Sequence, residues 1–161
     1  MTALLDLLNS RPLVDGAEQD ALGDPVAGRR WAREHGGDGS LEELALLREA
    51  RDVLRDVVLG TSSPAALSPL LEGVHQVPEF TSDGLLWTTK TPPHTRLAVE
   101  VILEWAATEE QLPGRLRPCA NDECRLFLLD RSRANTARWC SMAICGNRMK
   151  ARRHYRRTRE A

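Results

Sequence analysis

Residues 119–157 read CANDECRLFLLDRSRANTARWCSMAICGNRMKARRHYRR, and this stretch decides the fold of the C-terminal part of the chain. It contains all the cysteines of the 161-residue chain, which are Cys119, Cys124, Cys140 and Cys145. They form two pairs, with four residues inside each pair and fifteen residues between the pairs. Each pair can supply two thiolates from one turn, and the spacer lets the chain fold back. The spacing therefore predicts a tetrahedral site for one structural zinc ion.

The redox compartment bears on how these thiols are used. The start of the chain lacks the basic residues and the long apolar run of a signal peptide, which favours the cytoplasm, where thiols stay reduced. Two disulfides, or a redox switch in which oxidation expels zinc, are the alternative interpretations. Four thiolates leave no open coordination position for water, and no phosphate loop or Ser-His-Asp arrangement is present. We therefore expect no enzymatic activity.

Charge is distributed unevenly along the chain. Residues 115–161 contain thirteen Lys and Arg against four Asp and Glu, whereas the whole chain has 22 and 23. The C-terminal part is thus strongly basic, and the preceding part is acidic by a similar margin. A basic segment beside a zinc module predicts a polyanion partner, although a basic tail that only solubilises the protein is the simpler alternative.

The pattern of residues predicts a small ribbon and a helix around the metal. We expect residues 125–129 and 137–139 to form paired strands, and Ser141 to cap a helix that runs to about Arg157. Gly146 lies in that helix at a cost of about 1 kcal/mol relative to Ala, which suggests a packing requirement. Asn147 and Arg148 are expected to orient the thiolates or to pair with Asp130, with phosphate contact as the alternative for Arg148.

Beyond Met149 the predicted helix is basic on every side. Such a surface is suited to phosphate contacts along duplex DNA or to entry into a major groove. Some of these cations also complement the negative end of the helix dipole, which explains part of the pattern without a ligand. The candidate nucleic-acid-binding residues are Arg148, Lys150, Arg152, Arg153, Arg156 and Arg157.

The residues before the finger are mainly helical in pattern. Capping residues, helix-period apolar stripes and stop signals predict helices over residues 3–9, 24–36, 40–60, 63–73 and 94–108. The last of these is apolar nearly all round, which predicts a buried central helix. Residues 74–80 and 85–89 predict a β-hairpin, because Asp83-Gly84 lies between them. Arg48, Asp52 and Arg55 are expected to form a solvated face of the helix over residues 40–60.

The C-terminal motifs resemble a known family. The cysteine spacing, Trp139-Cys140-Ser141-Met142 and Cys145-Gly146-Asn147-Arg148 are similar to the CGNR zinc finger, which in that family follows a helical ABATE domain. The resemblance implies a stress-induced transcription regulator that binds DNA. It also implies that Asn9 lines a ligand pocket, although an Asn that ends the first helix is the simpler interpretation. The chain departs from the family in having no Pro inside the first cysteine pair and no basic run before Trp139.

These observations together predict a mainly α fold with two domains. Residues 1–112 are expected to form a helical ABATE-like domain with a small β-hairpin. Residues 115–161 are expected to form the four-cysteine finger, a short hairpin followed by a basic helix. The predicted function is transcription regulation through binding to duplex DNA, with the first domain sensing a small molecule or binding a protein partner. A zinc-stabilised module that binds RNA or an acidic protein is the alternative, and the sequence leaves the oligomeric state open, a homodimer included.

Overall fold

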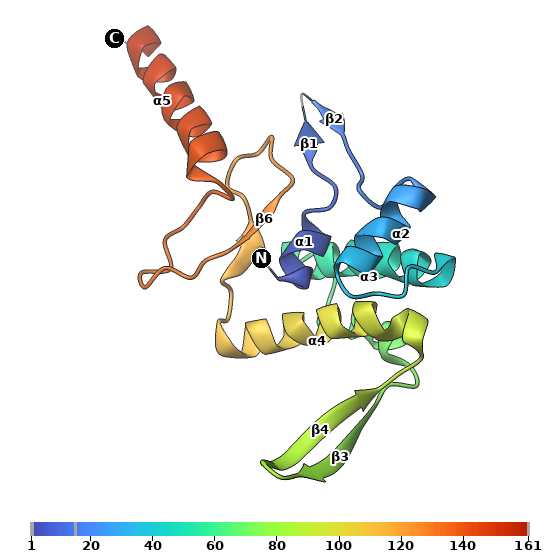
Figure 1. The fold of residues 1–161 in the computed structure, drawn as a ribbon. Helices are drawn as coiled ribbons and strands as arrows, with labels where there is room; N and C mark the ends of the chain where they lie inside the picture. Colours follow the sequence, from blue (N-terminus) through green and yellow to red (C-terminus); the bar gives the residue numbers. More distant parts are fainter. Residues whose placement is uncertain (1, 15, 161) are drawn as a thin grey trace.

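The computed structural model of the chain describes residues 2–14 and 16–160, of which about half are helical (Figure 1). We call residues 2–112 the body and residues 115–160 the finger. None of the helices in the described ranges is both long and apolar enough to cross a membrane. The elements are α1 (Ala3–Leu8), β1 (Leu13–Val14), β2 (Ala17–Glu18), α2 (Pro25–Glu34), α3 (Leu41–Leu59), η1 (Pro64–Leu71), β3 (His75–Thr81), β4 (Gly84–Lys90), η2 (Pro93–Thr95), α4 (Arg96–Gln111), β5 (Leu116–Pro118), β6 (Phe127–Leu129), η3 (Met142–Gly146) and α5 (Asn147–Glu160).

The helices of the body begin and end where the sequence predicts. The Asp24 carboxylate accepts a hydrogen bond from the amide of Ala27 at 2.8 Å, and the Ser40 hydroxyl accepts one from Glu43 at 3.1 Å. These bonds satisfy amide groups that the first turn of a helix leaves without partners. Gly60 ends α3 in a left-handed conformation with φ of 74°, which a residue without a Cβ adopts at little cost.

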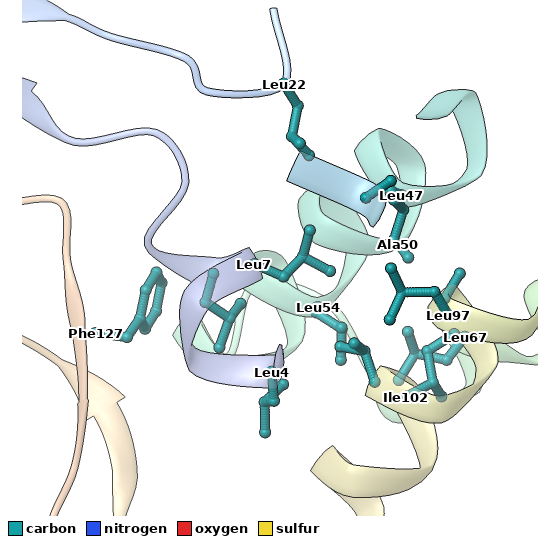
Figure 2. Packing of buried hydrophobic residues seen from close by; sticks show 14 of the residues in the cluster. Leu4, Leu7, Leu22, Leu47, Ala50, Leu54, Leu67, Leu97, Ile102 and Phe127 are labelled. Atoms are coloured by element: carbon teal, nitrogen blue, oxygen red, sulfur yellow. The ribbon is translucent and has the colours of Figure 1, made fainter. Parts of the chain in front are cut away.

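A hydrophobic core lies where α1, α3 and α4 meet (Figure 2). Leu7, Leu47 and Leu54 are fully buried there, and Leu97 and Ile102 reach it from α4. The same core continues into the finger, because Leu116 of β5 and Phe127 of β6 belong to it. These two side chains are 4% and 2% exposed, so the first part of the finger is packed against the body rather than tethered to it.

The expectation that α4 is buried all round is correct for its first half. Leu97, Val101 and Ile102 are buried, whereas Leu103 is half-buried and lies outside the core cluster. Ala106 and Ala107, in the second half, are exposed. The reason is that α1 and α3 pack against one side of α4 and leave its other side open (Figure 1).

The prediction of a solvated charged face on α3 is wrong for its arginines. The Arg48 guanidinium donates to the carbonyl of Leu22 at 2.7 Å, and that of Arg55 donates to the carbonyl of Leu8 at 2.8 Å. Arg51, which is only 2% exposed, pairs with Asp20 at 2.6 Å. Burial tends to raise the pKa of Asp20, but hydrogen bonds from Arg51 and the Leu22 amide, together with the charges of Arg51 and Arg11, outweigh it and lower that pKa. Arg55 thus reaches a carbonyl at the C-terminal end of α1, where the helix supplies no partner, and Arg48 reaches one in the turn before α2.

The predicted hairpin is confirmed as β3 and β4, an antiparallel ribbon whose closing pair is Thr81 and Gly84. Ser82 and Asp83 form its two-residue turn. The ribbon extends away from the helices, at the end of the molecule opposite α5 (Figure 1). Every residue of β3 is exposed, so the ribbon takes no part in the core.

Candidate metal centre and nucleic-acid interface

The four cysteines converge on one point. Their sulfur atoms all lie within 4.8 Å of one another, and the Sγ of Cys140 lies 3.7 Å from those of Cys124 and Cys145. A tetrahedral zinc ion with Zn–S bonds of about 2.3 Å places its ligand sulfurs about 3.8 Å apart. All four thiols are free, and these separations are far longer than a disulfide bond. The site thus fits one structural zinc ion held by four thiolates, as predicted.

Different elements position the two cysteine pairs. Cys119 and Cys124 lie in the loop between β5 and β6, where the amide of Cys119 donates to the carbonyl of Leu126 at 2.8 Å. Cys145 lies in the π-helical turn η3, which the Ser141 hydroxyl caps by accepting from the amide of Ile144 at 3.4 Å. The second pair is therefore attached directly to the start of α5, so the metal fixes that helix relative to the ribbon β5–β6.

Hydrogen bonds and burial set the chemistry of the thiols. The Asn121 side chain, which is fully buried, donates from Nδ2 to Cys145 Sγ at 3.5 Å. Burial raises the pKa of the Cys124 thiol to about 11 and also raises the pKa of Cys140. Burial works in the same direction at Cys145, but the hydrogen bonds from Asn121 and from the other three cysteines together outweigh it and lower the pKa there. Buried thiols of this kind lose their protons when the metal binds, which couples zinc binding to folding.

The structure corrects the predicted roles of Asn147, Arg148 and Asp130. Asn147 is exposed and donates to the carbonyl of Ala143 at 3.3 Å, whereas Arg148 is exposed on α5. The residue that contacts a thiolate is Asn121, which sequence reasoning missed although it lies two residues after Cys119. Asp130 is 1% exposed and pairs with Arg117 at 2.6 Å.

The predicted strand pairing in the finger is also wrong. β6 pairs with β5, with Leu116 opposite Leu129 and Pro118 opposite Phe127, and residues 137–139 form no strand. The buried carboxylate of Asp130 accepts a hydrogen bond from the amide of Ala137 at 2.8 Å. A side chain thus supplies the partner that a strand would have provided, and hydrogen bonding with Ser132 helps to lower the pKa of this carboxyl group.

Gly146 has the packing reason that the sequence suggested. A Cβ at this position would lie 2.8 Å from Sδ of Met142 and 3.3 Å from Cδ1 of Trp139. The glycine therefore lets Met142 and Trp139 close over the turn that carries Cys145. Met142 is nevertheless 54% exposed, so its side chain covers this turn only in part.

The basic helix α5 extends from the metal centre away from the body (Figure 1). Arg148, Lys150, Arg153, Arg156 and Arg157 are exposed along it. Arg152 differs, because it forms ion pairs with Glu123 and with Asp122, the latter at 3.6 Å. Five of the six predicted nucleic-acid-binding residues are thus exposed cations, and Arg152 also braces α5 against the loop of the first cysteine pair.

A cavity of about 1250 Å³ lies between the body and the finger. Its lining includes Asp6, Asn9, Trp31 and His35 from the body, and Trp139 and Arg148 from the finger. The Trp31 and His35 rings stack at 3.8 Å, and His35 Nε2 lies 3.5 Å from an Asp6 carboxylate oxygen. Asn9 both ends α1 and lines this cavity. Its amide side chain also bonds to the backbone N–H and C=O of Phe127, at 2.7 and 3.1 Å.

Comparison with known families agrees with this geometry. The model of the ABATE family, described as "Putative stress-induced transcription regulator", matches residues 2–127. The model of the CGNR zinc finger matches residues 115–158. No curated protein matches the chain. The two matched ranges overlap over residues 115–127, which is the segment where Leu116 and Phe127 enter the shared core.

Proposed function

Because this chain belongs to the ABATE family and carries a CGNR zinc finger, we propose that it is a cytoplasmic transcription regulator that binds duplex DNA through α5. The observation that carries the proposal is the direction of α5, whose cations extend away from the acidic body (Figure 1). A helix with exposed Arg and Lys along its length neutralises phosphates without first breaking internal ion pairs. The zinc ion has a structural role, since four thiolates close its coordination, and we propose no catalysis.

The proposal is tested by the salt dependence of DNA binding. Arg153, Arg156 and Arg157 are replaced together by Ala in the full zinc-loaded chain, and affinity for a fluorescent duplex is measured by anisotropy over a range of salt concentrations. If each residue neutralises one phosphate, the slope of log affinity against log salt should flatten by about 2.7. Arg152 is left in place because its ion pairs with Asp122 and Glu123 hold α5.

A matched control removes the same charge from the body. Arg30, Lys90 and Arg96 are exposed there, each in an ion pair with a neighbouring glutamate, and their joint replacement by Ala should leave the slope unchanged. Zinc content and circular dichroism confirm that both variants are folded. Equal effects of the two triple variants would contradict a specific role for α5. An unchanged slope in the α5 variant would instead place the contact surface around Arg131, Arg133 and Arg138, and preferential binding to RNA would favour the interaction-module alternative.

The cavity between the body and the finger bears on the predicted role of the first domain, which is to sense a small molecule. We propose that a small molecule binds there, because a ligand in this space contacts the body and the finger together and so changes how α5 is presented. Aromatic rings beside polar groups, such as Trp31 with Asp6 and His35, are typical of ligand cavities. A thermal-shift screen of small molecules on the wild type and on Trp31→Ala tests this. Ligands that stabilise both proteins equally would place binding outside the cavity.

A further inference from the structure

The ribbon β3–β4 has one apolar face and one polar face. Residues that are directly opposite in an antiparallel pair project to the same side, and neighbours along a strand alternate. The register pairs Pro78 with Trp87 and Phe80 with Leu85, so these four side chains share one face. The other face carries the ion pair between Lys90 and Glu79 at 3.2 Å, together with the paired side chains of Glu79 and Leu86.

The apolar face is open to solvent. Phe80 is 88% exposed, Trp87 56% and Leu85 51%, and Pro78 is exposed beside them. The ribbon extends from the body, so no other described element covers it (Figure 1). A two-stranded ribbon is at best marginally stable in water, and one with a covered apolar face is much better stabilised. A layer that covers this face would therefore stabilise the ribbon.

We propose that this face, made by Pro78, Phe80, Leu85 and Trp87, is the contact surface of a homodimer, in which the ribbons of two copies pack face to face. In a two-fold dimer the same patch lies on both sides of the interface, so it must complement itself. The face meets this condition, because all its side chains are uncharged, Gln76 and Thr89 at its end included. Two copies therefore approach without like-charge repulsion, whereas a foreign partner would find no charge here to select it.

The area is appropriate for a reversible dimer. Since a large aromatic side chain buries about 150–250 Å² when fully covered, the exposed parts of the four side chains amount to roughly 400 Å² per chain. Two such faces give on the order of 800 Å², which is the size of a weak, transient interface and below the ~1,200 Å² of stable ones, so we expect a dimer that dissociates readily, with a dissociation constant in the micromolar range or above. The ribbon and α5 lie at opposite ends of the molecule, so this dimer leaves both basic helices accessible (Figure 1).

Adjacent leucines on the two faces give a matched test. Leu85 and Leu86 are 51% and 53% exposed and lie opposite Phe80 and Glu79, so Leu85→Lys and Leu86→Lys should both be harmless to the fold. Sedimentation velocity of the full zinc-loaded chain, from about 1 to 200 μM, gives the dimer dissociation constant in that expected range. We expect Leu85→Lys to weaken the dimer at least 10-fold, because it places unpaired ammonium groups in an apolar contact, and Leu86→Lys to have little effect.

Three outcomes would overturn the proposal. A wild-type chain that is monomeric at every concentration would remove the dimer, and the face would then be a site for another protein. Equal weakening by both variants would place both faces in the contact. A dimer that survives both variants would lie at a strand edge or on another surface. None of these readouts requires DNA, so they are independent of the proposed function.

Discussion

The body and the finger are stabilised in different ways. The body buries a continuous layer of leucines from α1, α3 and α4, so its fold follows from the hydrophobic effect. The finger contributes Leu116 and Phe127 to that layer, and beyond them its buried groups are mainly cysteines and polar side chains such as Asn121 and Asp130. The comparison indicates that the folding of β5 and β6 depends on packing against the body, whereas the folding of η3 and of the start of α5 depends on metal binding.

Metal removal should separate these two contributions and have the largest effect. Structural zinc supplies about 10 kcal/mol or more in small modules, so chelation or Cys145→Ser should unfold the loop of the second pair, η3 and the start of α5. The helices of the body should persist. Two-dimensional NMR of the full chain measures this residue by residue, and restored zinc should return the wild type to its first spectrum. Cooperative loss of the whole fold would show that the shared core couples the two parts more strongly than we infer.

A core truncation in the body tests the other side of the comparison. Leu54 is fully buried in the core cluster, and Leu54→Ala should reduce the free energy of unfolding by about 2–5 kcal/mol. Leu103, which is half-buried outside that cluster, should lose less than about 2 kcal/mol when changed to Ala. Urea unfolding of the zinc-loaded variants measures both. Equal losses would mean that the second half of α4 belongs to the core after all.

The features that the sequence predicts correctly are those determined by residues close together in the chain. Asp24 and Ser40 mark helix starts because their side chains satisfy nearby amide groups, and Asp83-Gly84 marks the turn of β3–β4. The zinc ligands follow from spacing alone, because two cysteines on one turn are already close together. In the helix caps, in the turn and within each cysteine pair, the residues involved are only a few positions apart in the chain.

The predictions that fail concern partners distant in sequence. The ion pair of Arg51 with Asp20 spans 31 positions, and β5 contains only three residues, too few to give a strand pattern. The strand predicted over residues 137–139 fails for a different reason, because the Asp130 carboxylate, seven positions away, accepts from the amide of Ala137. Such interactions depend on how the whole chain is folded, so local pattern and propensity carry little information about them.

The smallest expected effect lies at the junction of the two parts. Asn9 Oδ1 accepts from the amide of Phe127 at 2.7 Å, and its Nδ2 donates to the carbonyl of Phe127 at 3.1 Å. A side-chain amide has both a donor and an acceptor, which explains why this residue type can link α1 to β6. Since Phe127 is 2% exposed, its backbone groups should be left without partners in Asn9→Ala, at a cost of about 1–3 kcal/mol.

Two comparisons make the Asn9 result specific. Asn9→Asp keeps the acceptor but places a carboxylate beside the Phe127 carbonyl, so at neutral pH it should be at least as destabilising as Asn9→Ala. Asn147→Ala is the matched control, because Asn147 is an exposed asparagine of the finger whose side chain bonds within its own turn, to the Ala143 carbonyl. Urea unfolding should separate Asn9→Ala from this control, and hydrogen exchange at the Phe127 amide should become faster in Asn9→Ala alone. If the two Ala variants are equally stable and Phe127 stays protected in both, packing of the Phe127 ring, and not the Asn9 amide, joins the finger to the body.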